Sequence, residues 1–319
     1  MLEVELDIFS GMPNPTWMLS KRQEKTLYDL LRAEPGQISP VAISSRQIGL
    51  GYRGLIVRRI KTDDGVWDKA VSARRAPFPN EFRLGIKAAK KDAAADWLVK
   101  TASRQGARLT DDVQAVVSRG VVLIPRARGP VDPSARIDRR RVEKAEVAVD
   151  VPYKPGAKIH ETWWACGSNY FSANANFFND PAHVTRNNCY CFASNHMPDI
   201  RYARPGQRAG HPATSLTCGG VIDGLRADGW KDGCEPNALT IVLVIWPNND
   251  YHFYRLVTGG PYWWWGHKPG GTPARYTDDC GHSIFQYQGK GYAPNNICRG
   301  PYTDFCGYFY QNNWTAYVA

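Results

Sequence analysis

All eight cysteines of this 319-residue chain lie in its second half. They are Cys166, Cys189, Cys191, Cys218, Cys234, Cys280, Cys298 and Cys306. A chain of this length exceeds what one hydrophobic core usually organises, so we expect two domains with a boundary before the first cysteine. Dense cysteines are typical of domains in oxidising surroundings, where bridges stabilise loop-rich folds. The second half is therefore expected to carry disulfides.

The amino-acid composition indicates a folded protein and leaves its compartment open. Hydrophobic residues make up 43% of the chain and aromatic residues 12%, which is enough apolar surface to offset the loss of chain entropy. The first residues lack the basic and apolar segments of a signal peptide, and no stretch is long and apolar enough to span a bilayer. The cysteine content favours secretion or delivery outside the cell, unless the thiols stay reduced.

The region 1–125 is expected to form a small α+β domain without cysteine. Alternating residues predict strands at 2–9 and 54–60, and an apolar run predicts a short strand at 121–124. Helical patterns cover 21–32, 84–103 and 111–118. No set of side chains in this region suggests a chemistry, so its role stays open.

The region 126–155 is expected to form a basic linker rich in proline and arginine. It contains eight basic and five acidic residues and contributes to a net charge of +10. Such a segment is typical of a solvated connection. It can also tether the chain to an anionic partner such as a wall polymer or a phospholipid surface. No nucleic-acid-binding module accompanies the charge, so nucleic acid is not the expected partner.

A cysteine stands where a helix is expected to begin. Asn187 and Asn188 are good N-cap residues, and an apolar pattern starts directly afterwards, which places Cys189 in the first helical turn. Unpaired amides and the helix dipole stabilise a thiolate there and lower its pKa. The alternative is that Cys189 belongs to a disulfide or is a buried thiol. Cys191 points elsewhere on the helix and is expected in a disulfide or in the core.

Two histidines are expected on neighbouring strands. A helix is expected within 212–230, and the apolar run 238–246 then predicts a central strand buried on both faces. The segments 251–257 and 262–267 continue an antiparallel meander. His252, near the start of one strand, and His267, near the end of the next, lie at the same edge of such a sheet, so their imidazoles can meet. A thiol, a base and an orienting group are the parts of a catalytic triad.

The segment 185–270 resembles the NlpC/P60 and CHAP groups of papain-like amidases and peptidases. Those families place a catalytic cysteine at the start of a helix, as in Cys189-Tyr190-Cys191-Phe192-Ala193, and a histidine at the start of a core strand, as at His252. The segment is also similar to uncharacterised bacterial proteins with an Asn-Asn-Cys-Tyr start. The resemblance implies an α+β fold in 156–319, in which the helix that bears the cysteine packs on an antiparallel sheet.

The resemblance implies a cysteine hydrolase or transamidase that acts on an amide bond of a peptide or a cell-wall polymer. Cys189 would attack the carbonyl group, His252 would accept and return the proton, and His267 would orient the imidazole. Asp278 or Asp279 can take the third role instead. The substrate groove would be lined by Tyr262, Trp263, Trp264 and Trp265.

Two other functions remain open. The second domain can be a non-catalytic binding or toxin-like module that disulfides stabilise, with tryptophans and tyrosines that recognise a sugar or a surface. It can also hold zinc or copper through Cys189, Cys191 and nearby histidines, because thiolate and imidazole suit these metals. The sequence has no Cys-x-x-Cys spacing, so we expect neither a metal nor another cofactor.

Overall fold

A computed structural model describes most of the chain as two compact units. The described residues are 1–42, 49–60, 78–86, 92–104, 106–107, 109–120, 175–233, 238–258, 262–287 and 290–319. Unit 1 comprises Met1–Ile8, Asn14–Ile43 and Gly51–Ile124, and unit 2 comprises Phe9–Pro13, Ser44–Leu50 and Pro125–Ala319. Unit 2 thus includes two short pieces of the region 1–125. The predicted linker 126–155, the strand predicted at 121–124, Cys166 and Cys234 lie outside the described residues.

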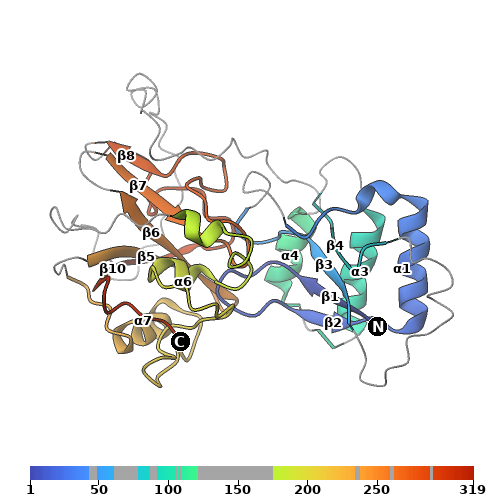
Figure 1. Cartoon of the computed structure of the whole chain (residues 1–319), viewed down its shortest axis with the longest axis horizontal. Coiled ribbons are helices and arrows are strands. Elements are labelled where there is room, and N and C mark those ends of the chain that lie inside the picture. The colour runs from blue at the N-terminus through green and yellow to red at the C-terminus, as the bar shows by residue number, and fades with distance from the viewer. Residues whose placement is uncertain are drawn as a thin grey trace. The chain divides into compact units, whose positions relative to one another are not determined.

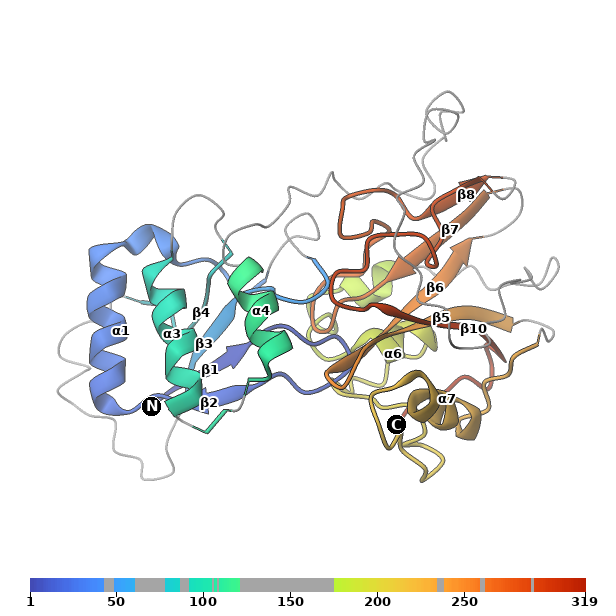
Figure 2. The same ribbon diagram turned by 180° about the vertical axis from the view of Figure 1, so that it is seen from behind.

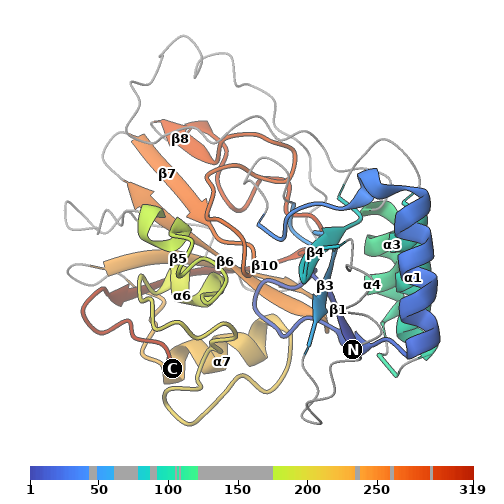
Figure 3. The same cartoon turned by 45° about the vertical axis from the view of Figure 1, so that its right-hand side comes forward.

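The expected α+β class is confirmed, because both units combine helices with antiparallel sheets (Figure 1). Unit 1 has a four-stranded sheet in the order β2-β1-β3-β4. The strands are β1 (Leu2–Leu6), β2 (Thr16–Met18), β3 (Leu55–Arg59) and β4 (Glu81–Leu84). Three helices lie on one side of this sheet (Figure 3), namely α1 (Lys21–Ala33), α3 (Ala93–Arg104) and α4 (Asp111–Gly120), and the short η1 (Pro35–Gln37) follows α1.

The helix predicted at 84–103 is wrong in its first part. Residues 81–84 pair with β3 as the edge strand β4, and the helix starts only at Ala93. Asp92 precedes that helix, and its carboxylate accepts hydrogen bonds from the amides of Gly85 and Ala95. A long-range strand pairing has therefore replaced a local helical preference.

A buried ion-pair network lies at the end of the unit 1 sheet. The carboxylate of Asp7 accepts from the guanidinium groups of Arg53 at 2.8 Å and Arg83 at 2.7 Å. All three side chains are almost fully buried. Burial alone raises the pKa of Asp7, but the two guanidinium charges outweigh it and hold that pKa well below its usual range.

Unit 2 has a six-stranded antiparallel sheet in the order β10-β5-β6-β7-β8-β9, which Figure 2 shows from behind. Its strands are β5 (Ala238–Trp246), β6 (Asp250–Thr258), β7 (Tyr262–His267), β8 (Phe285–Tyr287), β9 (Lys290–Gly291) and β10 (Asp304–Asn312). All nine residues of β5 are buried, as expected for a central strand. This sheet is the frame on which the predicted site residues are placed.

The helices of unit 2 pack on one face of its sheet (Figure 1). They are η3 (Ala175–Asn179), α6 (Cys189–Ala193) and α7 (Cys218–Ala227). The core on this face includes Phe192 of α6, Leu225 of α7, and Leu243 of β5. No helix within the described ranges is both long and apolar enough to cross a membrane.

Candidate functional site

Cys189 begins helix α6, as the sequence predicts. The Asn188 side chain caps the helix, because its Oδ1 accepts from the amides of Tyr190 at 3.1 Å and Cys191 at 3.2 Å. The Asn188 Nδ2 atom donates to the carbonyl oxygens of Gly11 and Ala203. The cap is therefore fixed from both ends of its amide group.

The environment of Cys189 does not favour a thiolate. The side chain is fully buried, and its sulfur donates a weak hydrogen bond to the carbonyl oxygen of Tyr251 at 3.8 Å. Burial, followed by the negative charge of Asp250, raises the pKa of this thiol well above its ordinary value. The expectation of a lowered pKa is therefore wrong, because α6 has only five residues and its surroundings exclude water.

His252 and His267 meet as their strand positions predict. The His252 Nε2 atom lies 2.7 Å from the His267 Nδ1 atom, and both side chains are fully buried. The His267 Nε2 atom is 2.9 Å from the Thr277 carbonyl oxygen and 2.9 Å from the Arg275 Nε atom. Burial and the nearby Arg275 charge lower the pKa of His267 well below its usual value, so its imidazole is neutral.

The sheet separates Cys189 from this histidine pair. The core beside α6 contains Tyr251 and Phe253 of β6 together with Cys189. Because side chains alternate between the faces of a strand, His252 points to the other face. There its ring packs against Tyr254 and Tyr302, with centroids 5.1 Å and 5.5 Å away. The predicted triad is corrected accordingly: the structure brings His252 and His267 together and places Cys189 on the opposite face.

The alternative third residues, Asp278 and Asp279, accept hydrogen bonds from other groups. Asp279 accepts from Arg275 at 2.6 Å and from the Leu50 amide at 2.7 Å. It is thus linked to the histidine pair through Arg275. Asp278 accepts from the amides of Cys280, His282 and Cys298 and organises the disulfide-bonded loop.

Sequence reasoning missed Lys268, which fixes the segment in front of Cys189. Its Nζ atom donates to the carbonyl oxygens of Val184 at 2.6 Å, Asn187 at 2.6 Å and Gly270 at 2.7 Å. The side chain is fully buried. Three acceptors match the three N–H bonds of an ammonium group. The available signal was a lysine directly after the predicted strand 262–267, which is rich in aromatic residues, since a lysine in apolar surroundings is buried only with partners.

The predicted aromatic groove is also corrected. Trp264 and Trp265 are 4% and 0% exposed and cannot line a substrate groove. Trp264 packs on Phe285 with ring centroids 4.6 Å apart, and Trp265 packs on Tyr308 at 6.0 Å. Trp263 is half-buried, and the side chain of Tyr262 lies outside the described part of the chain. The tryptophans of β7 therefore belong mainly to the core.

Two disulfides lie among the described residues of unit 2, as its cysteine content predicts. Cys218 at the start of α7 is bridged to Cys306 of β10, and Cys280 is bridged to Cys298. Cys189 and Cys191 are free and buried. In the described ranges, the one cysteine and histidine cluster with metal-ligand spacing is Cys280, His282 and Cys298, in which the bridge already occupies both sulfurs. The hypothesis of a metal bound by Cys189 and Cys191 has no support in this arrangement.

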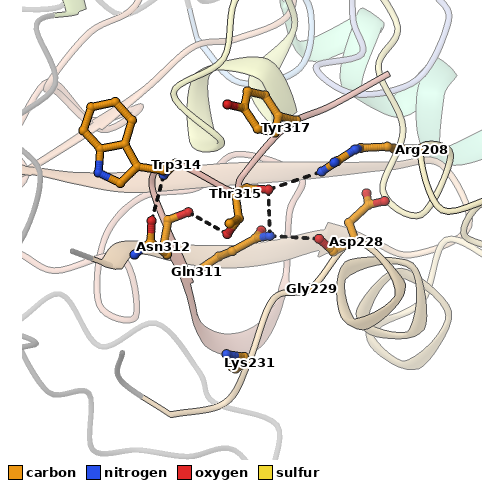
Figure 4. Close-up of a pocket in the computed structure, with 9 residues that line it drawn as sticks. All are labelled: Arg208, Asp228, Gly229, Lys231, Gln311, Asn312, Trp314, Thr315 and Tyr317. Atoms are coloured by element: carbon orange, nitrogen blue, oxygen red, sulfur yellow. Dashed lines mark hydrogen bonds between the residues drawn. The ribbon is translucent and has the colours of Figure 1, made fainter. Parts of the chain in front are cut away.

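A hollow of about 720 Å³ opens on the surface of unit 2 (Figure 4). Its lining comes from the C-cap of α7 and the residues that follow it, from the end of β10 and the C-terminal segment after it, and from the loop that contains Arg208. It is lined by Arg208, Asp228, Gly229, Lys231, Gln311, Asn312, Trp314, Thr315 and Tyr317. No local sequence pattern indicates this site, because its residues come from positions up to more than 100 residues apart.

Together, the two units define a disulfide-bearing α+β protein with a buried histidine pair and with two exposed aromatic side chains, Trp314 and Tyr317, near the C-terminus. No family model and no solved structure matches the chain. The chain belongs to the family of Insoluble matrix shell protein 1 from Ruditapes philippinarum. The two proteins are 38% identical over 146 residues, which are 45% of this chain and 89% of the relative.

Proposed function

We propose that unit 2 is a non-catalytic binding module, stabilised by disulfides, that attaches to an insoluble matrix polymer. The observation that carries the proposal is the position of Cys189 on the opposite face of the sheet from His252. A thiol hydrolase needs its base within hydrogen-bonding reach of the nucleophile. The relative is named for an insoluble shell matrix, which supports a role in a matrix.

The state of the cysteines supports the same proposal. Cys189 and Cys191 are both fully buried, and burial raises the pKa of each thiol. Reactive cysteines instead occupy partly exposed, electropositive surroundings. The two bridges close loops of 88 and 18 residues by sequence separation. Such cross-links suit a module that must persist in oxidising surroundings.

A cysteine hydrolase or transamidase of the NlpC/P60 or CHAP type is the second candidate. The observation that favours it is that Cys189 stays a free thiol at the start of a helix capped by Asn188, while other cysteines in the described part of the unit form disulfides. In this candidate, the sulfur and the His252 imidazole would have to reach the same face of the sheet. Peptides and cell-wall polymers would then be substrates.

Thiol labelling of the native protein separates the two candidates. The full chain is treated with iodoacetamide near pH 7, and the modified residues are mapped by mass spectrometry before and after unfolding in urea. The binding module predicts that Cys189 and Cys191 react only after unfolding. Rapid modification of Cys189 in the folded protein would favour the hydrolase instead.

Sedimentation tests the binding role directly. The full chain is mixed with suspensions of chitin, calcium alginate gel and cross-linked gelatin, and the protein left in the supernatant is measured. We expect depletion by at least one polymer, and the same depletion for the Cys189→Ala variant, since the sulfur has no part in binding. Full recovery of the protein in the supernatants of all three suspensions would contradict a matrix-binding role.

A further inference from the structure

Two exposed aromatic side chains lie at the hollow of unit 2. Trp314 is 63% exposed and Tyr317 is 45% exposed, and both line the hollow (Figure 4). In the described residues, the other large hydrophobic side chains with this exposure are Met1 and Phe177. Folded proteins usually bury aromatic rings, so two exposed rings at one concave site indicate a surface that contacts a ligand.

The charge at the hollow is positive. Arg208 and Lys231 are exposed at its edge. The hollow has one acidic lining residue, Asp228, and its carboxylate faces the interior, where it accepts from the Tyr190 hydroxyl group and from the Gly206 amide, both at 2.6 Å. Asp228 is only 7% exposed. A ligand that enters the hollow therefore meets two cations and no exposed carboxylate among the lining residues.

The backbone that carries these groups is held in place before any ligand arrives. The amide of Trp314 donates to the Asn312 side chain at 2.9 Å, and Arg208 donates to the Thr315 carbonyl oxygen at 3.2 Å. The Arg208 guanidinium also lies over the Tyr317 ring, 5.2 Å from its centroid. Lys231 exchanges backbone hydrogen bonds with Tyr310 of β10. A site fixed in this way loses little conformational entropy when it binds.

A buried acceptor in the wall of the hollow has no partner in the described residues. The Nε2 atom of Gln311 donates to the carbonyl oxygens of Asp228 at 2.9 Å and Thr315 at 3.2 Å. Its Oε1 atom accepts no hydrogen bond, although the side chain is only 4% exposed. Because this oxygen is closed off from solvent, Gln311 belongs to the frame of the hollow and does not contact a ligand; the exposed rings and cations of the lining carry that role.

We infer that this hollow binds a segment of an acidic polysaccharide, with a sugar ring stacked on Trp314 and its carboxylate or sulfate groups paired with Arg208 and Lys231. The inference rests on the proposed binding function and names its site and its ligand class. A pyranose ring offers an apolar C–H face to an aromatic ring and hydroxyl groups at its edge. The cations distinguish acidic from neutral polymers, because exposed charges attract an anionic chain.

Binding to soluble polymers tests the inference. The affinity of the full chain for alginate and chondroitin sulfate is compared with its affinity for neutral dextran by isothermal titration calorimetry. We expect measurable binding to the acidic polymers, weakened by added salt because salt screens exposed charges, and at least about tenfold weaker binding to dextran, which corresponds to about 1.4 kcal/mol. Equal affinity for dextran and alginate would overturn the acidic ligand class.

Variants at the hollow locate the site. Trp314→Ala is expected to weaken binding to alginate at least about fivefold, and Trp314→Tyr, which keeps an aromatic ring, should bind nearly as well as the wild type. Arg208→Gln with Lys231→Gln should weaken binding and reduce its salt dependence. The matched controls are Phe177→Ala, an exposed ring elsewhere on unit 2, and Lys21→Gln, an exposed cation of unit 1.

The outcomes distinguish this inference from the proposed function. If the chain sediments with matrix polymers but the Trp314 and Arg208 variants bind alginate like the wild type, the hollow is not the site and the binding role stands. If no suspension depletes the chain, the binding role itself fails. Circular dichroism of each variant checks that its fold is retained.

Discussion

The Nζ atom of Lys268 donates a 2.6 Å hydrogen bond to the carbonyl oxygen of Asn187, directly before the cap of helix α6. Two further carbonyl oxygens, those of Val184 and Gly270, complete the set of acceptors. The start of α6 is thus held by one buried cation from the end of β7. The consequence is that the geometry around Cys189 depends on a residue about 80 positions later in the chain.

Replacing this lysine tests its role. Lys268→Met leaves three buried carbonyl oxygens without their donor, and we expect the free energy of unfolding to fall by about 3 kcal/mol or more. Urea denaturation followed by tryptophan fluorescence measures the change. Lys25→Met is the matched control, because the Lys25 side chain is 83% exposed and makes only a surface ion pair. Equal effects of the two substitutions would contradict the assigned role.

The two disulfides should differ in their contribution to stability. The Cys218–Cys306 bridge has a sequence separation of 88 and the Cys280–Cys298 bridge one of 18. The loss of conformational entropy in the unfolded chain predicts a stabilisation of about 4.6 kcal/mol from the first bridge and about 3.2 kcal/mol from the second. Each bridge is removed by replacing both of its cysteines with alanine, and the free energy of unfolding is measured by chemical denaturation. Removing the Cys218–Cys306 bridge should lower this free energy more than removing the Cys280–Cys298 bridge. A larger loss for the shorter loop would show that native contacts, not loop entropy, dominate.

His267 should make unit 2 sensitive to acid. Burial and the charge of Arg275 lower the pKa of His267 well below its usual value near 6.5. Below pH 6.5 the unfolded chain binds a proton that the folded protein does not, so stability falls as the pH drops, with a slope of about 1.4 kcal/mol per pH unit. In His267→Gln we expect lower stability at pH 8 but a flatter pH dependence between pH 6.5 and 5. If the stability of the wild type and of His267→Gln changes equally with pH, His267 is not the cause of the acid sensitivity.

Asp7 provides a test in unit 1. In Asp7→Asn, the guanidinium groups of Arg53 and Arg83 lose their buried counterion. Removing one partner of a buried ion pair typically costs about 3–5 kcal/mol, and thermal unfolding should show a matching loss. Asp29→Asn is the control, because Asp29 is 53% exposed and pairs with Arg32 and Lys25 at the surface. A loss no larger than that of the control would contradict a structural role for Asp7.

The strands of the unit 2 meander could be predicted because their signals are local. The apolar run 238–246 coincides with β5, and the predicted segments 251–257 and 262–267 match β6 and β7 within one residue. Strand β10 was not predicted. Its sequence contains Gly307, and its pairing with β5 shifts register between Phe305 and Gly307, which interrupts the alternation of its side chains.

The face on which each side chain lies could not be predicted. Strand β5 is buried on both faces and shows no alternation, so the sequence does not reveal which face of its neighbour β6 carries the helix. A change of one residue exchanges the two faces. Here Tyr251, not His252, lies on the side of Cys189. The meeting of His252 with His267 needed only strand order and was predicted correctly.

The bridge between Cys218 and Cys306 joins residues 88 positions apart, from the first residue of α7 to strand β10. A protease that cuts the chain once anywhere between these two cysteines leaves two fragments that remain covalently joined. On a gel without reductant the nicked protein would still migrate as one species, and only reduction would release the pieces. A cut in a loop between these two cysteines therefore does not release strand β10 from the unit.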